Sequence, residues 1–161
     1  MRLDEPPIFF LDRTFGRNEL ARMLRQHDFI LVTMFEEFGE ADSRITDPTM
    51  IYDCGLKSRV LLTADKELPY LWAREMLDAK IAVFVVTNNN EGPQAWGPRI
   101  VHAKRDILRE LRRRERPFAA RISTDGRVTQ VRIYKESKWV TIEAGKKNPP
   151  HVNRQKPEKT P

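Results

Sequence analysis

The chain of 161 residues is long enough for one domain with a hydrophobic core and hardly long enough for two. Its apolar fraction of 40% and charged fraction of 32% are typical of a soluble globular protein, and no apolar run approaches the roughly 20 residues that cross a bilayer. The N-terminal segment lacks the apolar core of a signal peptide, and Cys54 is the only cysteine. We therefore expect a cytoplasmic protein without an internal disulfide and without a membrane partner. One cysteine and three scattered histidines also disfavour a zinc site.

The net charge of +6 is unevenly distributed along the chain. Residues 1–98 contain 11 lysines and arginines against 16 aspartates and glutamates, whereas residues 99–161 contain 18 against 7. An acidic half followed by a basic half is typical of a cation-binding body joined to a surface that binds a polyanion such as nucleic acid. A solvated basic helix followed by a charged tail would give the same pattern.

Apolar runs alternate with helical patterns as far as Pro117. Four runs are typical of buried strands in a mostly parallel sheet: residues 8–11, 29–34, 59–63 and 81–87. Apolar residues at helical spacing predict helices over residues 17–27, 47–55, 68–76 and 99–116. Residues 35–42 and 93–98 are predicted to be loops. This alternation predicts an α/β fold with its ligand site at the carboxyl edge of the sheet.

The pattern changes after Pro117. Residues 118–124 and 127–134 flank Asp125-Gly126, which predicts a hairpin with a type I′ turn, and residues 139–142 could add a third strand. These strands either extend the edge of the sheet or form a small subdomain. From Ala144 onward the composition predicts a disordered basic tail, whose deletion should leave thermal stability nearly unchanged. We therefore expect a main domain over residues 1–117, a β-hairpin extension over 118–143 and a tail over 144–161.

Two of the predicted strands end in an aspartate. Asp12 and Asp65 each follow a buried strand directly, so both should emerge at the same edge of the sheet. Asp47 begins the helix that leads to the second of these strands, and we expect it near that edge too. Three carboxylates would repel one another there unless a cation neutralised them, and oxygen-only ligands favour Mg²⁺ or Mn²⁺ over zinc. Such ions commonly support the hydrolysis of phosphate esters.

Each candidate also has a plain structural explanation. Asp47 before Pro48 is typical of a helix N-cap, and Asp65 could open the turn before the next helix. Asp12 has no evident turn or capping role. A strand that ends in aspartate is also typical of phosphatases with an aspartyl nucleophile. Those enzymes usually carry a second carboxylate two residues later, and Thr14 stands there instead.

Polar and basic residues near the predicted strand ends and on the basic helix are candidates for substrate binding. Six are singled out: Arg13, Thr63, Lys66, Asn88, Lys104 and Arg105. The cations could bind phosphate or merely moderate the field of the carboxylates. Thr63 could donate a hydrogen bond to Asp65 or simply fill a strand position, and Asn88 could line the cleft or form part of an Asn-rich turn.

The runs Phe9-Phe10-Leu11-Asp12-Arg13 and Val60-Leu61-Leu62-Thr63-Ala64-Asp65-Lys66, with the Asp47 helix between them, resemble the PIN-like nuclease fold. The resemblance is to the branch that is similar to VapC-type toxins, and it covers roughly residues 8–112. It implies a three-layer α/β/α domain with a mostly parallel central sheet over residues 1–117. It also implies Mg²⁺- or Mn²⁺-dependent hydrolysis of RNA phosphodiester bonds by an endoribonuclease.

On that resemblance, Asp12, Asp47 and Asp65 are the catalytic metal ligands. Many PIN domains have a fourth acidic position, for which the candidates are Glu37 and, in addition, Glu36 and Asp53. The same resemblance leaves room for a toxin role beside an antitoxin protein. A homodimer also remains open.

Two other classes of function remain open at this point. The first is a nucleic-acid-binding module that keeps a PIN-like fold without the chemistry, which would bind RNA but show no response to Mn²⁺. The second is a protein-interaction domain that uses Trp72, Trp96 and the edge of the hairpin.

Overall fold

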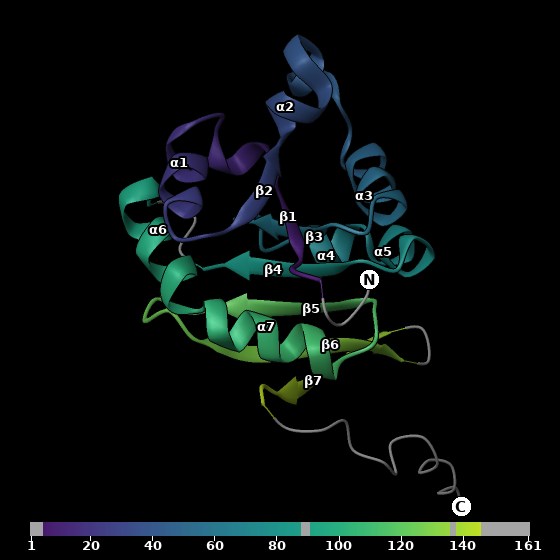
Figure 1. The fold of residues 1–161 in the computed structure, drawn as a ribbon. Helices are drawn as coiled ribbons and strands as arrows, with labels where there is room; N and C mark the ends of the chain where they lie inside the picture. The colour runs from purple at the N-terminus through teal and green to yellow at the C-terminus, as the bar shows by residue number, and fades with distance from the viewer. Residues whose placement is uncertain (1–4, 88–90, 136–137, 146–161) are drawn as a thin grey trace, which may run out of the picture.

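The computed structural model describes residues 5–87, 91–135 and 138–145 (Figure 1). These residues form one seven-stranded sheet, in the order β2-β1-β3-β4-β5-β6-β7. The strands are β1 (Ile8–Leu11), β2 (Ile30–Thr33), β3 (Val60–Thr63), β4 (Ala82–Val86), β5 (Phe118–Ile122), β6 (Val128–Lys135) and β7 (Lys138–Glu143). Strands β1 to β5 pair in parallel, whereas β6 and β7 add to the edge as antiparallel strands. The predicted α/β class is therefore confirmed, with a sheet that is mixed although mostly parallel.

Seven α-helices connect the strands in the described residues. They are α1 (Glu19–Arg25), α2 (Met34–Phe38), α3 (Asp47–Leu56), α4 (Leu68–Leu71), α5 (Ala73–Ala79), α6 (Pro93–His102) and α7 (Lys104–Arg113). Two 3₁₀ helices, η1 (Arg13–Phe15) and η2 (Gly39–Arg44), precede α1 and follow α2. No helix within these residues combines the length and the apolar character that a membrane span requires.

Successive residues of the parallel strands face two different hydrophobic cores. In β1, Phe9 and Leu11 join the core that contains residues of α1, α6 and α7, whereas Phe10 joins the core beneath α3 and α5. The same alternation holds in β3, where Leu62 faces the first core and Leu61 the second. Helices therefore cover both faces of the sheet, as Figure 1 shows. Burial on both faces explains why these strands have continuous apolar sequences.

Two segments that were predicted to be loops are helical. Residues 35–42 lie in α2 and η2, because Thr33 and Glu36 form a capping box: the Thr33 hydroxyl accepts from the Glu36 N–H, and the Glu36 carboxylate accepts from the Thr33 N–H. Residues 93–98 belong to α6, which tolerates Pro93 in its first turn. Gly97 permits close approach of α6 to α1, since a Cβ there would lie 2.5 Å from Cε of Met23.

Two predicted long helices are each divided in two. The basic helix predicted over residues 99–116 is split at Ala103 between α6 and α7. The helix predicted around Leu68–Met76 breaks at Trp72, whose φ of −120° and ψ of 35° lie outside the helical range. In both cases the apolar spacing identified helical segments, and it did not reveal the change of direction between them.

The C-terminal strands continue the main sheet. β5 pairs in parallel with β4, and β6 and β7 follow it, so the segment extends the sheet edge and does not form a separate subdomain. The turn is not type I′, which requires positive φ at both central residues, because only Gly126 has a positive φ, of 77°. The Gly126 N–H donates to the carbonyl of Ser123 at 3.0 Å, as in a type I turn that is followed by a left-handed glycine.

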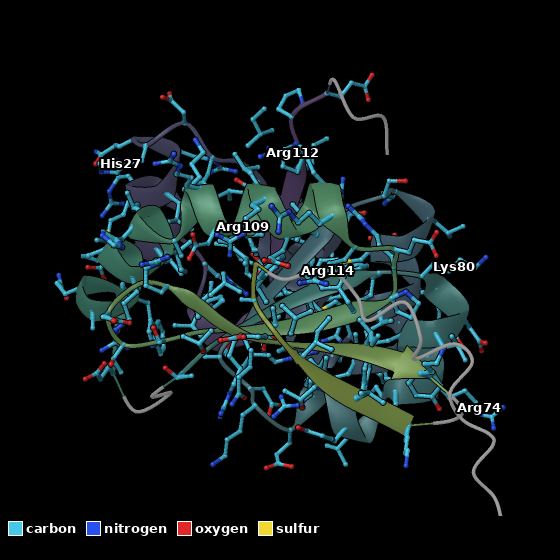
Figure 2. All side chains as sticks on the ribbon, turned by 90° about the horizontal axis from the view of Figure 1, so that it is seen from below. His27, Arg74, Lys80, Arg109, Arg112 and Arg114 are labelled. Carbon is cyan, nitrogen blue, oxygen red and sulfur yellow. The ribbon has the colours of Figure 1, made fainter. Side chains whose placement is uncertain are left out.

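The first residues of the predicted tail are bound to α7. The Gly145 N–H donates to the buried carboxylate of Glu110 at 2.7 Å, and Arg113 donates to the Gly145 carbonyl. Figure 2 shows Arg109 and Arg114 beside the last strands and Arg112 on the outer side of α7. The remainder of the predicted tail, residues 146–161, lies outside the described residues.

Candidate functional site

Asp12 lies at the carboxyl end of β1 and is only 3% exposed. Its Oδ1 accepts hydrogen bonds from the Thr14 N–H, at 2.9 Å, and from the Thr14 hydroxyl. Its Oδ2 accepts from the hydroxyl of Thr63, at the end of β3, over 2.5 Å. The bond from the Thr14 N–H caps η1, so Asp12 does have a capping role that the sequence did not suggest. These contacts fix the carboxylate at the edge where the parallel strands end.

Burial raises the pKa of the Asp12 carboxyl to about 6, although the hydrogen bonds from Thr14 and Thr63 lower it. The nearby negative charge of Asp47 contributes a further rise in that pKa. Desolvation is the dominant cause, because removing a carboxylate from water disfavours its charged form.

Asp12 differs from the other buried acidic residues in the described part of the chain, because none of its contacts there is an ion pair. Each of the others has an arginine partner: Asp42 with Arg17 at 2.9 Å, Asp106 with Arg127 at 2.9 Å and Glu110 with Arg114 at 2.7 Å. Buried charges in proteins are normally paired or bound to a metal. Asp12 is therefore a buried acid whose environment contains hydrogen bonds and a second carboxylate but, among the described residues, no compensating cation.

Asp47 was predicted to be the N-cap of α3. In the structure it is instead the first residue of that helix. Thr46 fills that position, since its hydroxyl accepts from the Thr49 N–H at 3.3 Å. The Asp47 carboxylate is bound instead by the indole N–H of Trp72, at 3.2 Å, and lies 3.7 Å from the guanidinium of Arg13. The plain explanation of Asp47 as a cap is thus removed, and its charge acts on Asp12.

Asp65 has the turn role that its sequence position suggested. Its Oδ1 accepts from the Glu67 N–H at 2.9 Å, before the start of α4. Its N–H donates to the Thr63 hydroxyl at 3.0 Å, and that same hydroxyl donates to Asp12. Thr63 therefore links the ends of β1 and β3, and its hydroxyl donates to Asp12 and not to the Asp65 carboxylate.

The structure brings the three aspartates to one edge without closing them into a compact cluster. Asp12 and Asp47 are coupled by their charges, whereas Asp65 is joined to Asp12 through Thr63. Within the residues that the structure describes, no three His, Cys, Asp or Glu side chains form a group that could hold a metal ion.

The candidates for a fourth acidic ligand are engaged elsewhere. Glu37 forms ion pairs with Lys57 and Arg59, which lie in the connection from α3 to β3, and these contacts lower the pKa of Glu37. Asp53 lies 3.0 Å from Lys57, in the same group of charges. Glu36 pairs with Arg25 at 2.7 Å. Arg59 directly precedes β3, so these ion pairs lie at the amino end of that strand. They are therefore away from Asp12, which lies at the carboxyl end of β1.

Arg13 has a structural role beside the three aspartates. Its guanidinium donates to the carbonyl of Asp42, at 3.2 Å, and to that of Ile45. Together with its approach to Asp47, these bonds attach η1 to the start of α3. Arg13 thus positions the chain around Asp47.

The basic helix does not bring its predicted substrate-binding residues to the aspartates. Lys104 donates to the carbonyls of His27 and Asp28, at 3.1 and 3.3 Å, at the amino end of β2. Arg105 is exposed on α7, and Lys66 is exposed directly after Asp65. Asn88 lies outside the described residues. Of these four, the structure places only Lys66 beside the candidate site.

Thr14 is a site residue that the sequence did not identify. Its hydroxyl donates to Asp12 and accepts from the Ala64 N–H at 3.0 Å, so it joins the end of β1 to the chain that leaves β3. Its position two residues after the strand aspartate was noted only because a carboxylate was absent there. The sequence signal for this role is a short hydroxyl side chain two residues after the aspartate, from which it can donate a hydrogen bond to the Asp12 carboxylate.

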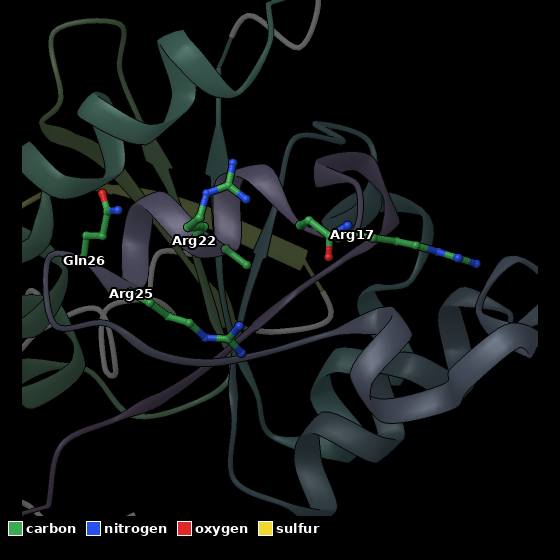
Figure 3. Close-up of a pocket in the computed structure, with 6 residues that line it drawn as sticks. Arg17, Arg22, Arg25 and Gln26 are labelled. Atoms are coloured by element: carbon green, nitrogen blue, oxygen red, sulfur yellow. The ribbon is translucent and has the colours of Figure 1, made fainter.

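Two cavities contain several cations. The larger, of about 510 Å³, lies over α1 and is lined by Arg17, Arg22, Arg25 and Gln26 among others (Figure 3). Arg17 and Arg25 are neutralised there by Asp42 and Glu36, and Figure 3 shows Arg17 extended away from Arg22. The smaller cavity, of about 220 Å³, is bordered by α4, β5 and β6 and begins at Lys66, next to Asp65.

No family model, no curated protein and no solved structure gives a match to this chain.

Proposed function

We propose that the protein is a Mg²⁺- or Mn²⁺-dependent ribonuclease with a three-layer PIN-like fold. The observation that carries the proposal is Asp12, a buried carboxylate with a second carboxylate nearby and no cation bound to it in the described residues. A divalent cation would supply the missing charge compensation. The choice of RNA as substrate rests on the resemblance of the Asp12 and Asp65 motifs to those of PIN-like nucleases.

The side chains at this edge offer oxygen atoms, which are the ligands that a hard divalent ion prefers. Asp12 and Asp47 present carboxylate oxygens, which suit Mg²⁺ and Mn²⁺. Asp12 and Asp47 would hold the ion, and Asp65, which is joined to Asp12 through Thr63, would approach it once the ion neutralised the repulsion between the carboxylates. A bound ion of this kind lowers the pKa of a water ligand and neutralises charge that develops on the scissile phosphate.

The chain itself holds these carboxylates in place. Thr14 and Thr63 fix the orientation of the Asp12 carboxylate, and their hydrogen bonds favour its ionised form over the neutral one. Trp72 and Arg13 hold the Asp47 carboxylate at the start of α3. A substrate phosphate would meet an edge that is already assembled, and such preorganisation is what catalysis by charge stabilisation requires.

The test is cleavage of single-stranded RNA by the purified chain, with Mn²⁺ and with EDTA, beside Asp12→Asn. We expect cleavage that needs Mn²⁺ and falls at least about 100-fold in the variant, since the loss of an outer-shell partner alone typically costs 10- to 100-fold and Asp12 would be a direct ligand. Asp28→Asn is the matched control, because it removes the same charge from an exposed left-handed position that asparagine tolerates.

A second measurement separates catalysis from simple RNA binding. Mn²⁺ should raise the melting temperature of the wild type and of Asp28→Asn, but not that of Asp12→Asn. Cleavage that persists in EDTA and in Asp12→Asn would overturn the proposal. RNA binding without any response to Mn²⁺ would favour the non-catalytic module instead.

A further inference from the structure

The 220 Å³ cavity, which we call the α4 groove, differs from the larger cavity in how its cations are partnered. Its lining includes three cationic side chains, Lys66, Arg121 and Arg132, against one carboxylate, Glu67. Lys66 follows Asp65 directly, and Arg121 lies opposite Val85 near the carboxyl ends of β5 and β4. The α4 groove therefore starts at the candidate catalytic edge and runs between α4 and the last strands.

The cations of the α4 groove have no acidic partner within the described residues. Neither Lys66 nor Arg121 takes part in a hydrogen bond or an ion pair there, and the contact of Arg132 is with an aromatic ring. In the larger cavity, by contrast, Arg17 and Arg25 are bound to carboxylates. Three cations without an ion pair in the described residues outnumber the one carboxylate around this hollow, which makes it a site for an anion.

The two faces of the outer strands explain why the α4 groove remains open. Ile122, Val131 and Ile133 turn toward α7 and its core. Arg121 and Arg132 lie on the other face, because Arg132 is paired in register with Ala119, which belongs to the core beneath α3 and α5. On that face α4 covers only part of the strands, so cationic side chains occupy positions that an apolar core does not claim.

Tyr70 adds an aromatic surface at the rim. Its side chain is 50% exposed, and the Arg132 guanidinium carbon lies 5.2 Å from its ring centroid. An exposed ring beside unpaired cations suits a single-stranded nucleic acid, in which a base can stack while its phosphate meets the charges. A paired base in a duplex could not reach the ring in this way.

We propose that the α4 groove binds single-stranded RNA next to the scissile bond, with successive backbone phosphates held by Lys66, Arg121 and Arg132 and a base stacked on Tyr70. This inference rests on the proposed ribonuclease function and extends it. It places the path of the substrate from Asp65 across β5 and β6. It also identifies unpaired RNA as the class of substrate.

The test is fluorescence anisotropy of a labelled ten-nucleotide uridine RNA, in EDTA so that no cleavage occurs. We expect Arg121→Ala/Arg132→Ala to raise the Kd at least about tenfold and to lower the salt slope of log K by about 1.4, because each lost phosphate contact on a single strand accounts for about 0.7. The control is Arg22→Ala/Arg74→Ala, which removes the same charge from two exposed residues outside the groove and should change the Kd less than about twofold.

The stacking contact is tested separately. Tyr70→Ala should raise the Kd at least about fivefold and leave the salt slope unchanged, whereas Tyr70→Phe should bind like the wild type. Lys66→Ala, at an exposed position, gives a second electrostatic variant if the double variant does not fold. A duplex of the same length should bind more weakly than the single strand and should not respond to Tyr70→Ala.

The outcomes separate the two proposals. Equal binding by the two arginine double variants, with Mn²⁺-dependent cleavage intact, would overturn the α4 groove as the RNA site and leave the nuclease proposal standing. The expected binding differences without any cleavage would overturn the nuclease and retain the groove. Preferential binding of the duplex would overturn the single-stranded assignment.

Discussion

The hydroxyl of Thr63 donates a hydrogen bond of 2.5 Å to Oδ2 of Asp12, and this contact joins the carboxyl ends of two adjacent parallel strands. Both side chains point to the core beneath α3 and α5, because each lies two residues beyond a residue of that core, Phe10 and Leu61. This shared orientation is what places Asp12 near Asp47 at the start of α3.

Asp12→Asn should stabilise the protein at alkaline pH. The folded-state pKa of about 6 exceeds the ordinary value of 3.8, so ionised Asp12 costs about 3 kcal/mol of folding stability above pH 6. Asparagine removes that cost but loses a hydrogen bond of about 1 kcal/mol, so we expect a net gain of about 2 kcal/mol at pH 8. Urea unfolding in EDTA measures it.

The direction of the pKa shift of Asp12 determines the pH range over which Asp12→Asn stabilises the protein. Because the pKa of Asp12 is raised on folding, its contribution to stability is fully present below about pH 4 and is lost as the pH rises through about 6. The advantage of Asp12→Asn should therefore disappear at pH 4, where only the lost hydrogen bond remains and the variant should be less stable than the wild type by up to about 1 kcal/mol. An advantage that is equal at pH 4 and pH 8 would contradict the raised pKa.

Thr14→Val should destabilise the fold and the catalytic edge together. It removes the hydroxyl that donates to Asp12 and accepts from the Ala64 N–H, which costs about 1–3 kcal/mol. It should also raise the pKa of Asp12 further, since that hydroxyl lowers it. Thr14→Ser keeps both bonds and should resemble the wild type in urea unfolding. Serine and valine variants of equal stability would show that the hydroxyl contributes nothing.

Glu110→Gln should unfold more readily than the wild type by about 3 kcal/mol, as expected when one partner of a buried ion pair loses its charge. Glu110 is fully buried, and its carboxylate accepts from Arg114, Arg109 and the Gly145 N–H. Glu115→Gln, at an exposed position just after α7, is the control and should stay within about 0.5 kcal/mol of the wild type. Thermal unfolding of all three proteins makes the comparison.

Two C-terminal deletions should differ in stability. Removal of residues 144–161 eliminates the bond from the Gly145 N–H to Glu110 and the bond from Arg113 to the Gly145 carbonyl, whereas removal of residues 146–161 keeps both. We expect the longer deletion to be less stable by about 2 kcal/mol, because a hydrogen bond to a charged group is worth about 1.5–3 kcal/mol. Identical melting temperatures would show that these contacts add no stability.

The sequence predicted the strand ends well because the signal for them is local. Four apolar runs became β1 to β4, and Asp12 and Asp65 lie where those runs stop. Parallel strands end at a common edge. The apolar run before each aspartate was therefore enough to predict that Asp12 and Asp65 lie at that edge. The turns were harder to predict, since α2 depends on a capping box and the breaks at Trp72 and Ala103 leave the apolar spacing intact.

Charge pairing is what only the tertiary structure decided. Glu37 could be read as a metal ligand and Lys104 as a phosphate contact, until Lys57, Arg59 and the carbonyls near His27 proved to be their partners. Those partners lie 20 to 77 residues away, so no local pattern specifies them. The sequence by itself determined which acids stand at the strand ends. Tertiary packing determined that Asp12 is buried and coupled to Asp47, because only the folded chain shows which charges are compensated.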